Sequence, residues 1–260
     1  MRLLRPLIIF AGLIALWQST VSFLSLPHYI LPAPARVAAA WWDRSGSILH
    51  HASVTGAEIL VGLALGAMLG CLSALTLASY RPARRWLMPM LVVSQSIPVF
   101  ALAPILVLWL GYGMGSKVAM ATLIIYFPVT TAFLDGLRRT EPGWLDLART
   151  MGASRRSILL HLRIPAALPA LASGIRVATA IAPIGAVVGE WVGSSAGLGF
   201  MMLHANARMQ IDVMFAALFT LGVMAVALYY AVDAVLRRFV SWQAETDPSR
   251  DHNDARSFPQ

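Results

Sequence analysis

Long apolar runs alternate with short polar connections along most of the chain. A transmembrane helix needs about 20 mainly apolar residues, because the hydrocarbon core is roughly 30 Å thick and a helix rises about 1.5 Å per residue. The pattern predicts six such spans, over residues 7–26, 53–78, 87–110, 117–133, 170–192 and 213–236. We therefore expect an all-α polytopic membrane protein, in which residues 1–242 form one transmembrane domain.

The first apolar run has a second interpretation. Arg2 and Arg5 precede residues 7–26, and a basic start followed by an apolar stretch is also typical of a cleaved signal peptide. No clear A-x-A cleavage site follows, and the run is long for a signal peptide. A retained first span is therefore the favoured interpretation.

Composition supports the membrane class. Hydrophobic residues make up 58% of the chain and charged residues 12%, with a mean hydropathy of +0.70, whereas soluble domains hold about 45–50% apolar and about 25% charged residues. The single cysteine, Cys71, lies in an apolar run and offers neither a disulfide nor a cysteine metal site. The histidines show no helical ligand pair, so no metal is expected.

The basic residues report the orientation of the spans. A net charge of +8 is compatible with nucleic-acid binding, but basic residues between apolar spans more often mark cytoplasmic loops, and no nucleic-acid partner is expected. One side holds only Arg36, Arg44, Lys117 and Arg208, and Arg176 falls within a span. The termini and alternate loops hold the other fifteen of the 20, which are Arg2, Arg5, Arg81, Arg84, Arg85, Arg138, Arg139, Arg149, Arg155, Arg156, Arg163, Arg237, Arg238, Arg250 and Arg256.

Six spans with both termini in the cytoplasm explain this asymmetry. The longest polar interruption, residues 135–169, then lies in the cytoplasm. The polar tail 243–260 lies there as well, and we expect it to be disordered. Membrane lipid surrounds the apolar spans.

The third span, 87–110, is interrupted. Pro98 lacks the N–H that an inner helical position needs, so the span is expected to be kinked or broken. Irregular backbone at membrane depth is tolerated only against protein or a water-lined cavity. Ser94, Gln95 and Pro98 are therefore candidates for lining a transport path. Two alternatives stay open, a kink without contact to cargo and hydrogen bonds from Ser94 and Gln95 to another helix.

A glycine stripe marks the second span. Gly62, Gly66 and Gly70 recur every four residues, which places them on one helix face and lets a second helix approach closely. We expect tight helix packing there, although glycine is also simply frequent in membrane helices.

The polar stretch 135–169 predicts two short helices joined by a turn. Pro142 suits a first helical turn, and Gly152 can adopt the left-handed conformation that ends the helix. Ser154 can cap a second helix that runs toward Pro165. The pattern is compatible with docking of a partner and equally with an interfacial pair that fixes the neighbouring spans. One face of the first helix carries Trp144, Leu145, Ala148 and Met151, and the other carries Asp146, Arg149 and Thr150.

The same stretch resembles the permease signature of ATP-driven importers, written E-A-A, three residues, G, nine residues, I-x-L-P. The matching residues are Asp146-Leu147-Ala148, Gly152 and Leu162-Arg163-Ile164-Pro165, with Asp in place of Glu and Leu in place of Ala. In those permeases the signature forms coupling helices that sit in a groove of a cytoplasmic ATPase subunit. The resemblance implies an ATPase-coupling role for Trp144, Asp146, Ala148, Gly152, Ser154, Leu162 and Pro165.

The resemblance covers most of the chain and extends to permeases of the nitrate, sulfonate and taurine type. Glu58 in TGAEILVG and residues 197–215 look most like permeases for a thiamine-precursor pyrimidine, hydroxymethylpyrimidine. It implies a type I ABC importer permease of the bacterial inner membrane, with both termini cytoplasmic. The implied partners are a second copy, two cytoplasmic ATPase subunits and an extracytoplasmic binding protein. Sulfonate, taurine, nitrate and riboflavin stay open as cargo.

The chain shows no nucleotide site of its own. The sequence most similar to a P-loop is GYGMGSKV at residues 111–118. Ser116 replaces the glycine that the turn requires, and Val118 replaces the Ser or Thr whose hydroxyl binds magnesium. We therefore expect no enzyme activity and no cofactor in this chain. ATP and Mg²⁺ are expected on the partner ATPase.

Two hypotheses from other classes compete with the importer. An ion-coupled secondary transporter would need titratable pairs within the membrane, and this chain has few. An intramembrane serine hydrolase is suggested by Gly193-Ser194-Ser195-Ala196-Gly197, which matches G-x-S-x-G and is followed by His204. That motif needs a strand that enters a helix, which an outer loop between membrane helices does not supply.

Glu190 is the remaining candidate. It lies near the outer end of the fifth span, where a charge costs less than the about 2.5–3.5 kcal/mol of the bilayer centre. A role in a gate or at a subunit interface is the first hypothesis. Cargo contact and a solvated interfacial carboxylate are the alternatives.

Overall fold

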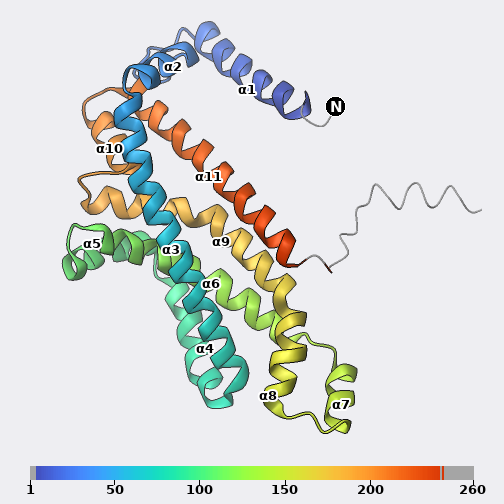
Figure 1. Ribbon diagram of the computed structural model, residues 1–260. Helices are drawn as coiled ribbons and strands as arrows, with labels where there is room; N and C mark the ends of the chain where they lie inside the picture. The colour runs from blue at the N-terminus through green and yellow to red at the C-terminus, as the bar shows by residue number, and fades with distance from the viewer. Residues whose placement is uncertain (1–3, 241, 243–260) are drawn as a thin grey trace, which may run out of the picture.

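The computed structural model describes residues 4–240 and 242, and all regular structure within them is helical (Figure 1). The expected fold class is confirmed. The tail 243–260 lies outside the described residues. The helices are α1 (Leu4–Phe23), α2 (Pro34–Asp43), α3 (Ser45–Ser79), α4 (Arg81–Ser96), α5 (Val99–Leu110), α6 (Met114–Arg138), α7 (Pro142–Thr150), α8 (Arg155–Ile158), the π-helix η1 (Leu159–Arg163), α9 (Ile164–Gly193), α10 (Leu198–Ala207) and α11 (Ile211–Phe239).

Four helical segments in the described part are long and apolar enough to cross a membrane. They are α3, α6, the continuous segment Arg155–Gly193 and α11. The third predicted span is broken, as expected, because α4 and α5 meet at an angle of 101° around Pro98, and this bent pair would make a fifth crossing. The apolar segment described in α1, Ala11–Phe23, is shorter, so the first of the six spans stays a prediction.

α6 lies between α3 and α9, and these three helices form the centre of the fold (Figure 1). Glycines allow the close approach on both sides. A Cβ at Gly66 of α3 would lie 2.6 Å from Cγ2 of Ile125, and a Cβ at Gly174 of α9 would lie 2.6 Å from Cβ of Ala132. Lipid supplies no hydrophobic force between helices, so such backbone proximity and the dispersion contacts it creates hold them together. Gly62 and Gly70 face α6 in the same way.

The second half of the polar stretch differs from the expected short helix. α8, η1 and α9 follow one another as one helical segment of 39 residues, Arg155–Gly193. Pro165 lies in the first turn of α9, and the π-helix Leu159–Arg163 directly precedes it. A π-turn shifts the hydrogen bonds from i−4 to i−5, which accommodates a residue without an N–H. The prediction of a separate second helix is therefore wrong, and this helix is part of the fifth span.

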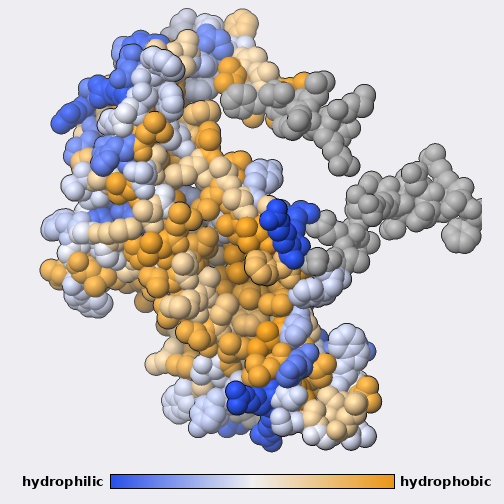
Figure 2. All heavy atoms as spheres, in the orientation of Figure 1, coloured by the Kyte–Doolittle hydropathy of each residue, from blue (hydrophilic) through white to orange (hydrophobic). Residues whose placement is uncertain are grey.

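The two ends of the molecule carry different elements. α7 projects at one end beside α8, while α2 and α10 lie at the opposite end (Figure 1). We call these the α7 end and the α10 end. Figure 2 shows mostly hydrophobic residues over the middle of the visible face and hydrophilic residues toward both ends, the distribution expected for a bundle surrounded by lipid.

An ion-pair network joins α11 to α9. Nε of Arg176 lies 2.6 Å from Oδ1 of Asp233, and Nε of Arg237 lies 2.8 Å from Oδ2 of the same carboxylate. Both carboxylate oxygens are thus used. The network fixes the last turns of α11 against the first half of α9.

Substitution at the glycine stripe tests the packing of the central helices. Gly66→Val should lower the free energy of unfolding by about 2 kcal/mol or more, because the added side chain collides with Ile125 on the facing helix. Thermal unfolding of the purified protein in detergent measures the effect. Gly222→Val in α11 is the matched control, since nothing lies within 4 Å of a Cβ there. Equal melting temperatures for the two variants would contradict the packing argument.

Candidate functional site

The helix at the α7 end presents an apolar face to its surroundings. Trp144, Leu147 and Met151 are 56%, 62% and 78% exposed, whereas Leu145 is buried. The sequence pattern places Leu145 on the same face as Trp144. That assignment is wrong, because Leu145 turns toward the bundle and Leu147 takes its place on the outward face, beside half-buried Ala148. Exposed apolar side chains one and two turns apart form a surface suited to a groove on a partner.

A tight turn fixes the direction of α7. Gly152 has a φ of +78°, a conformation that a side chain disfavours. The N–H of Ala153 donates to the carbonyl of Ala148 (2.9 Å) and that of Gly152 to the carbonyl of Arg149 (2.9 Å), which is the pattern of a Schellman C-cap. Ser154 then caps α8, because its Oγ accepts the N–H of Ser157 at 3.2 Å.

The remaining signature residues lie on both sides of this turn. Asp146 pairs with Arg149 at 2.7 Å on the exposed side of α7, where solvent screens the pair and it adds little stability. Leu162 is half-buried in η1, and Pro165 lies in the first turn of α9. We call α7 together with residues 151–165 the knob. It contains all seven residues to which the resemblance assigns coupling.

Glu190 holds α10 against the bundle at the other end. Its carboxyl accepts the N–H of Gly199 (2.5 Å) and the hydroxyl of Thr55 (2.6 Å), and Oγ1 of Thr55 accepts the N–H of Leu198 (2.8 Å). These N–H groups belong to the first turn of α10, where backbone N–H groups have no acceptor within the helix. The helix dipole also makes a negative charge favourable at this end. Glu190 is 1% exposed, so the solvated-carboxylate alternative is wrong. We call Thr55 and Glu190 the α10 anchor.

The backbone of the preceding loop is fitted to this carboxyl. Gly197 has a φ of +110°, and a Cβ there would overlap the carboxyl group of Glu190. Its N–H donates to Nδ1 of His51 at 3.0 Å. Glycine is therefore required at 197 for conformation and for space.

Lys117 is buried beside the anchor. It is 1% exposed, and Nζ donates to the carbonyls of Tyr112, Gly113 (2.8 Å) and Gly193 (2.5 Å). An ammonium group has three protons, so these three acceptors satisfy it fully. Lys117 thereby joins the turn before α6 to the last residue of α9.

Glu58 of α3 completes this buried group. It is 2% exposed and lies close enough to Glu190 and Lys117 to interact electrostatically with both. Opposite charges cost less to bury together than apart. From the sequence, Glu58 supports only the resemblance, Lys117 counts as an outer basic residue, and Thr55 is not a candidate. Charges inside apolar runs were the available signal, but three separate helices bring the residues together.

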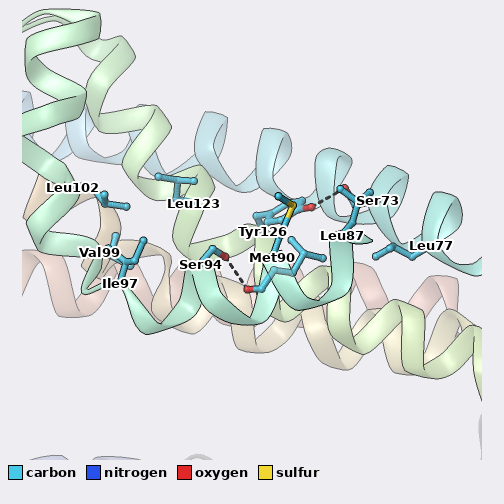
Figure 3. Close-up of a pocket in the computed structure, with 11 residues that line it drawn as sticks. Ser73, Leu77, Leu87, Met90, Ser94, Ile97, Val99, Leu102, Leu123 and Tyr126 are labelled. Atoms are coloured by element: carbon cyan, nitrogen blue, oxygen red, sulfur yellow. Dashed lines mark hydrogen bonds between the residues drawn. The ribbon is translucent and has the colours of Figure 1, made fainter. Parts of the chain in front are cut away.

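The candidate path residues lie at the bend between α4 and α5. Ser94 lines a cavity of about 380 Å³ and donates to the carbonyl of Leu91 at 2.7 Å (Figure 3). Pro98 precedes α5 at the bend, and the side chain of Gln95 lies outside the described residues. Tyr126 of α6 and Ser73 of α3 also line this cavity, and the Tyr126 hydroxyl donates to Oγ of Ser73 at 2.8 Å. The α10 anchor is a separate site, since neither Thr55 nor Glu190 lines this cavity.

The hydrolase motif does not form a catalytic group. The loop before α10 follows a helix rather than a strand, so Ser195, the serine of the motif, does not lie on a strand-to-helix elbow. Nδ1 of His204 lies 3.2 Å from the carbonyl oxygen of Phe200 in its own helix. Across the described residues no three His, Cys, Asp or Glu side chains gather as metal ligands.

Sequence comparison decides the family. Residues 62–243 match the family described as "Binding-protein-dependent transport system inner membrane component". The chain belongs to this family. It is the non-catalytic, multi-pass membrane subunit of a binding-protein-dependent ABC importer. The hypothesis of an ion-coupled secondary transporter is therefore wrong.

Relatives of this inner membrane component cover nearly its full length. A "Probable ABC transporter permease protein" of Haemophilus influenzae is 54% identical over 92% of this chain and 98% of its own. The "Formylaminopyrimidine transport permease protein ThiX" of Halalkalibacterium halodurans is 36% identical over 92% and 96%. The "Riboflavin transport system permease protein RibX" of Chloroflexus aurantiacus is also 36% identical, over 89% and 87%.

A solved transporter shares the fold of this permease. The inward-facing MetNI methionine ABC transporter contains a chain that aligns with a TM-score of 0.58 and 20% identity, over 80% of this chain and 98% of its own. At 20% identity this similarity supports a shared arrangement of helices alone.

Removal of the Glu190 carboxyl tests the α10 anchor. Glu190→Ala should lower the free energy of unfolding by about 2–4 kcal/mol, because the Thr55 hydroxyl and the N–H of Gly199 lose their acceptor inside the protein. Hydrogen–deuterium exchange of the peptide 197–207 should become faster. Asp212→Ala is the control, since this carboxylate accepts the N–H of the neighbouring Val213 at the start of α11 (3.1 Å). Unchanged exchange in Glu190→Ala would show that other contacts hold α10.

Proposed function

We propose that two copies of this chain form the membrane path of an importer driven by two cytoplasmic ATPase subunits, with cargo delivered by an extracytoplasmic binding protein. The observation that carries the proposal is the exposed apolar face of α7, made by Trp144, Leu147 and Met151. A surface of this kind is stable in water only when a partner covers it. A groove on an ATPase subunit is the partner that the knob fits.

The charges support a cytoplasmic position of the knob. Basic residues concentrate in cytoplasmic loops, and six arginines lie in or directly before the knob, namely Arg138, Arg139, Arg149, Arg155, Arg156 and Arg163. The α10 end then faces outward, toward the binding protein. Six spans would also place both termini in the cytoplasm.

Each knob residue has a definite part in coupling. Trp144 and Ala148 belong to the face of α7 that enters the groove, and Asp146 presents a carboxylate at its exposed side. Gly152 and Ser154 hold the turn, and Leu162 and Pro165 continue it into α9. Closure of the ATPases on ATP would move α7, and the movement would pass along α9 to Glu190. Glu190 thus acts in the gate by holding α10.

For the cargo we propose a thiamine-precursor pyrimidine. Support comes from the likeness to the formylaminopyrimidine permease over 92% of the chain. Riboflavin is the second candidate, because the riboflavin permease is equally similar, at 36% identity. Affinities of the companion binding protein for hydroxymethylpyrimidine, formylaminopyrimidine, riboflavin, taurine and nitrate, measured by calorimetry, would decide between them. A preference for any compound other than a pyrimidine would refute this cargo.

A charge on the outward face of α7 tests the coupling role. Leu147→Glu should reduce ATP-dependent uptake at least tenfold, because a carboxylate would have to be buried in the ATPase groove without a partner. Uptake is measured in proteoliposomes that contain the complete transporter and loaded binding protein. Gly152→Asp should have a similar effect, since its φ of +78° disfavours a side chain.

Phe239→Glu is the matched control for this experiment. Phe239 is 69% exposed at the end of α11, outside the knob, so a charge there should leave uptake nearly normal. The coupling proposal fails if Leu147→Glu still copurifies with the ATPase and transports at the wild-type rate.

A further inference from the structure

The cavity at the broken span lies between four helices and is open on one side. Its volume is about 380 Å³, and its walls come from α3, α4, α5 and α6 (Figure 3). The bend of 101° lets one broken span supply two of these walls, because α4 and α5 diverge at Pro98. Pockets that hold small ligands have volumes of about 300–1,000 Å³. The cavity is therefore large enough for one small molecule.

Hydroxyl groups from three helices supply its polar positions. The Tyr126 hydroxyl donates to Oγ of Ser73 at 2.8 Å, and Ser94 adds a third hydroxyl from α4. Each hydroxyl offers one proton and two lone pairs. The Tyr126–Ser73 pair uses one proton and one lone pair, so it can still donate once and accept from a ligand.

The remaining wall is apolar and uncharged. Leucine, isoleucine, valine and methionine side chains make up the rest of it, and no Lys, Arg, His, Asp or Glu lines it among the described residues. An anion entering this space would lose part of its hydration and gain no counter-charge, which costs more than the same burial of a neutral polar group. A sulfonate or nitrate ion does not fit this chemistry, whereas a neutral ring with hydrogen-bonding groups on its edge does.

The size and shape of the wall favour a single flat ring. The volume lies near the lower limit for ligand pockets, which suits one ring better than the three fused rings and ribityl chain of riboflavin. Met90 and Tyr126 both line the cavity (Figure 3). Methionine sulfur and aromatic rings both make favourable contacts with a flat ligand.

We infer that this cavity binds the cargo in transit, an uncharged single-ring nitrogen heterocycle, and that the Tyr126–Ser73 pair determines its specificity. The inference rests on the proposed function, since it names the site at which the proposed pyrimidine would be held. The cargo is then recognised in this cavity, and the α10 anchor takes no part in recognition.

Direct binding to the purified permease–ATPase complex in nanodiscs tests the inference. Tritiated hydroxymethylpyrimidine is the probe, and no binding protein is added. The complex should bind it saturably, and Tyr126→Phe and Ser73→Ala should each weaken binding about fivefold, the effect of one lost hydrogen bond. Leu102→Trp, which fills the cavity, should abolish binding. Excess methanesulfonate should not displace the probe.

Thr76→Ala is the matched control, because Thr76 lies on the same helix and its exposed hydroxyl bonds to the carbonyl of Leu72 (2.8 Å) in its own helix. Its affinity should equal that of the wild type, and melting temperatures show whether any variant is misfolded. Absence of saturable binding, or equal affinities for wild type, Tyr126→Phe and Leu102→Trp, would overturn the inference. ATP-dependent pyrimidine uptake by the complete transporter is measured in parallel. If uptake is normal while the cavity variants bind like wild type, only the inference fails; if the transporter does not import pyrimidine at all, the proposed cargo fails.

Discussion

The close approach of α6 to both α3 and α9 is the constraint on which the rest of this permease depends. Within lipid, helices gain little from apolar burial against each other, so contact between backbones must supply the attraction. Gly66 and Gly174 allow that contact on opposite sides of α6. Because these three helices are fixed, the knob at one end and the α10 anchor at the other occupy defined positions, and the loosely attached α4 and α5 can bend away and leave a cavity.

Much of this architecture could be predicted from local rules. Glycines four residues apart, Pro98 inside an apolar run and the Gly152–Ser154 turn each act through their own backbone geometry. The continuous helix Arg155–Gly193 could not be predicted, because the π-turn before Pro165 was not visible in the composition of the stretch. The outward face of α7 was misjudged for a related reason, since only the position of the bundle decides which leucine is covered.

The buried charges at the α10 end show the limit of sequence reasoning most clearly. Glu58, Lys117 and Glu190 come from α3, α6 and α9, and nothing in the spacing along the chain places them together. Each alone would be costly at membrane depth. Lys117 and Glu190 bond to the free carbonyl and N–H groups of turns and helix ends, so the cost of burial is offset by order in the loops. Glu190 was selected from the sequence, but its role in holding α10 depends on residues that were not.

The unbroken helix from the knob to the anchor has a mechanical consequence. A helical segment of 39 residues is about 58 Å long at about 1.5 Å per residue, which exceeds the thickness of the membrane. If it behaves as a rigid rod, a tilt of about 5° at the knob displaces its other end by about 5 Å, which is close to the rise of one helical turn. Pro169 and Pro183 lie within it and are the points at which such a rod would flex. The proposed ATPase contact and α10 would then be connected by one helical segment. The stiffness of that segment between Pro169 and Pro183 would determine how much of the movement of α7 reaches α10.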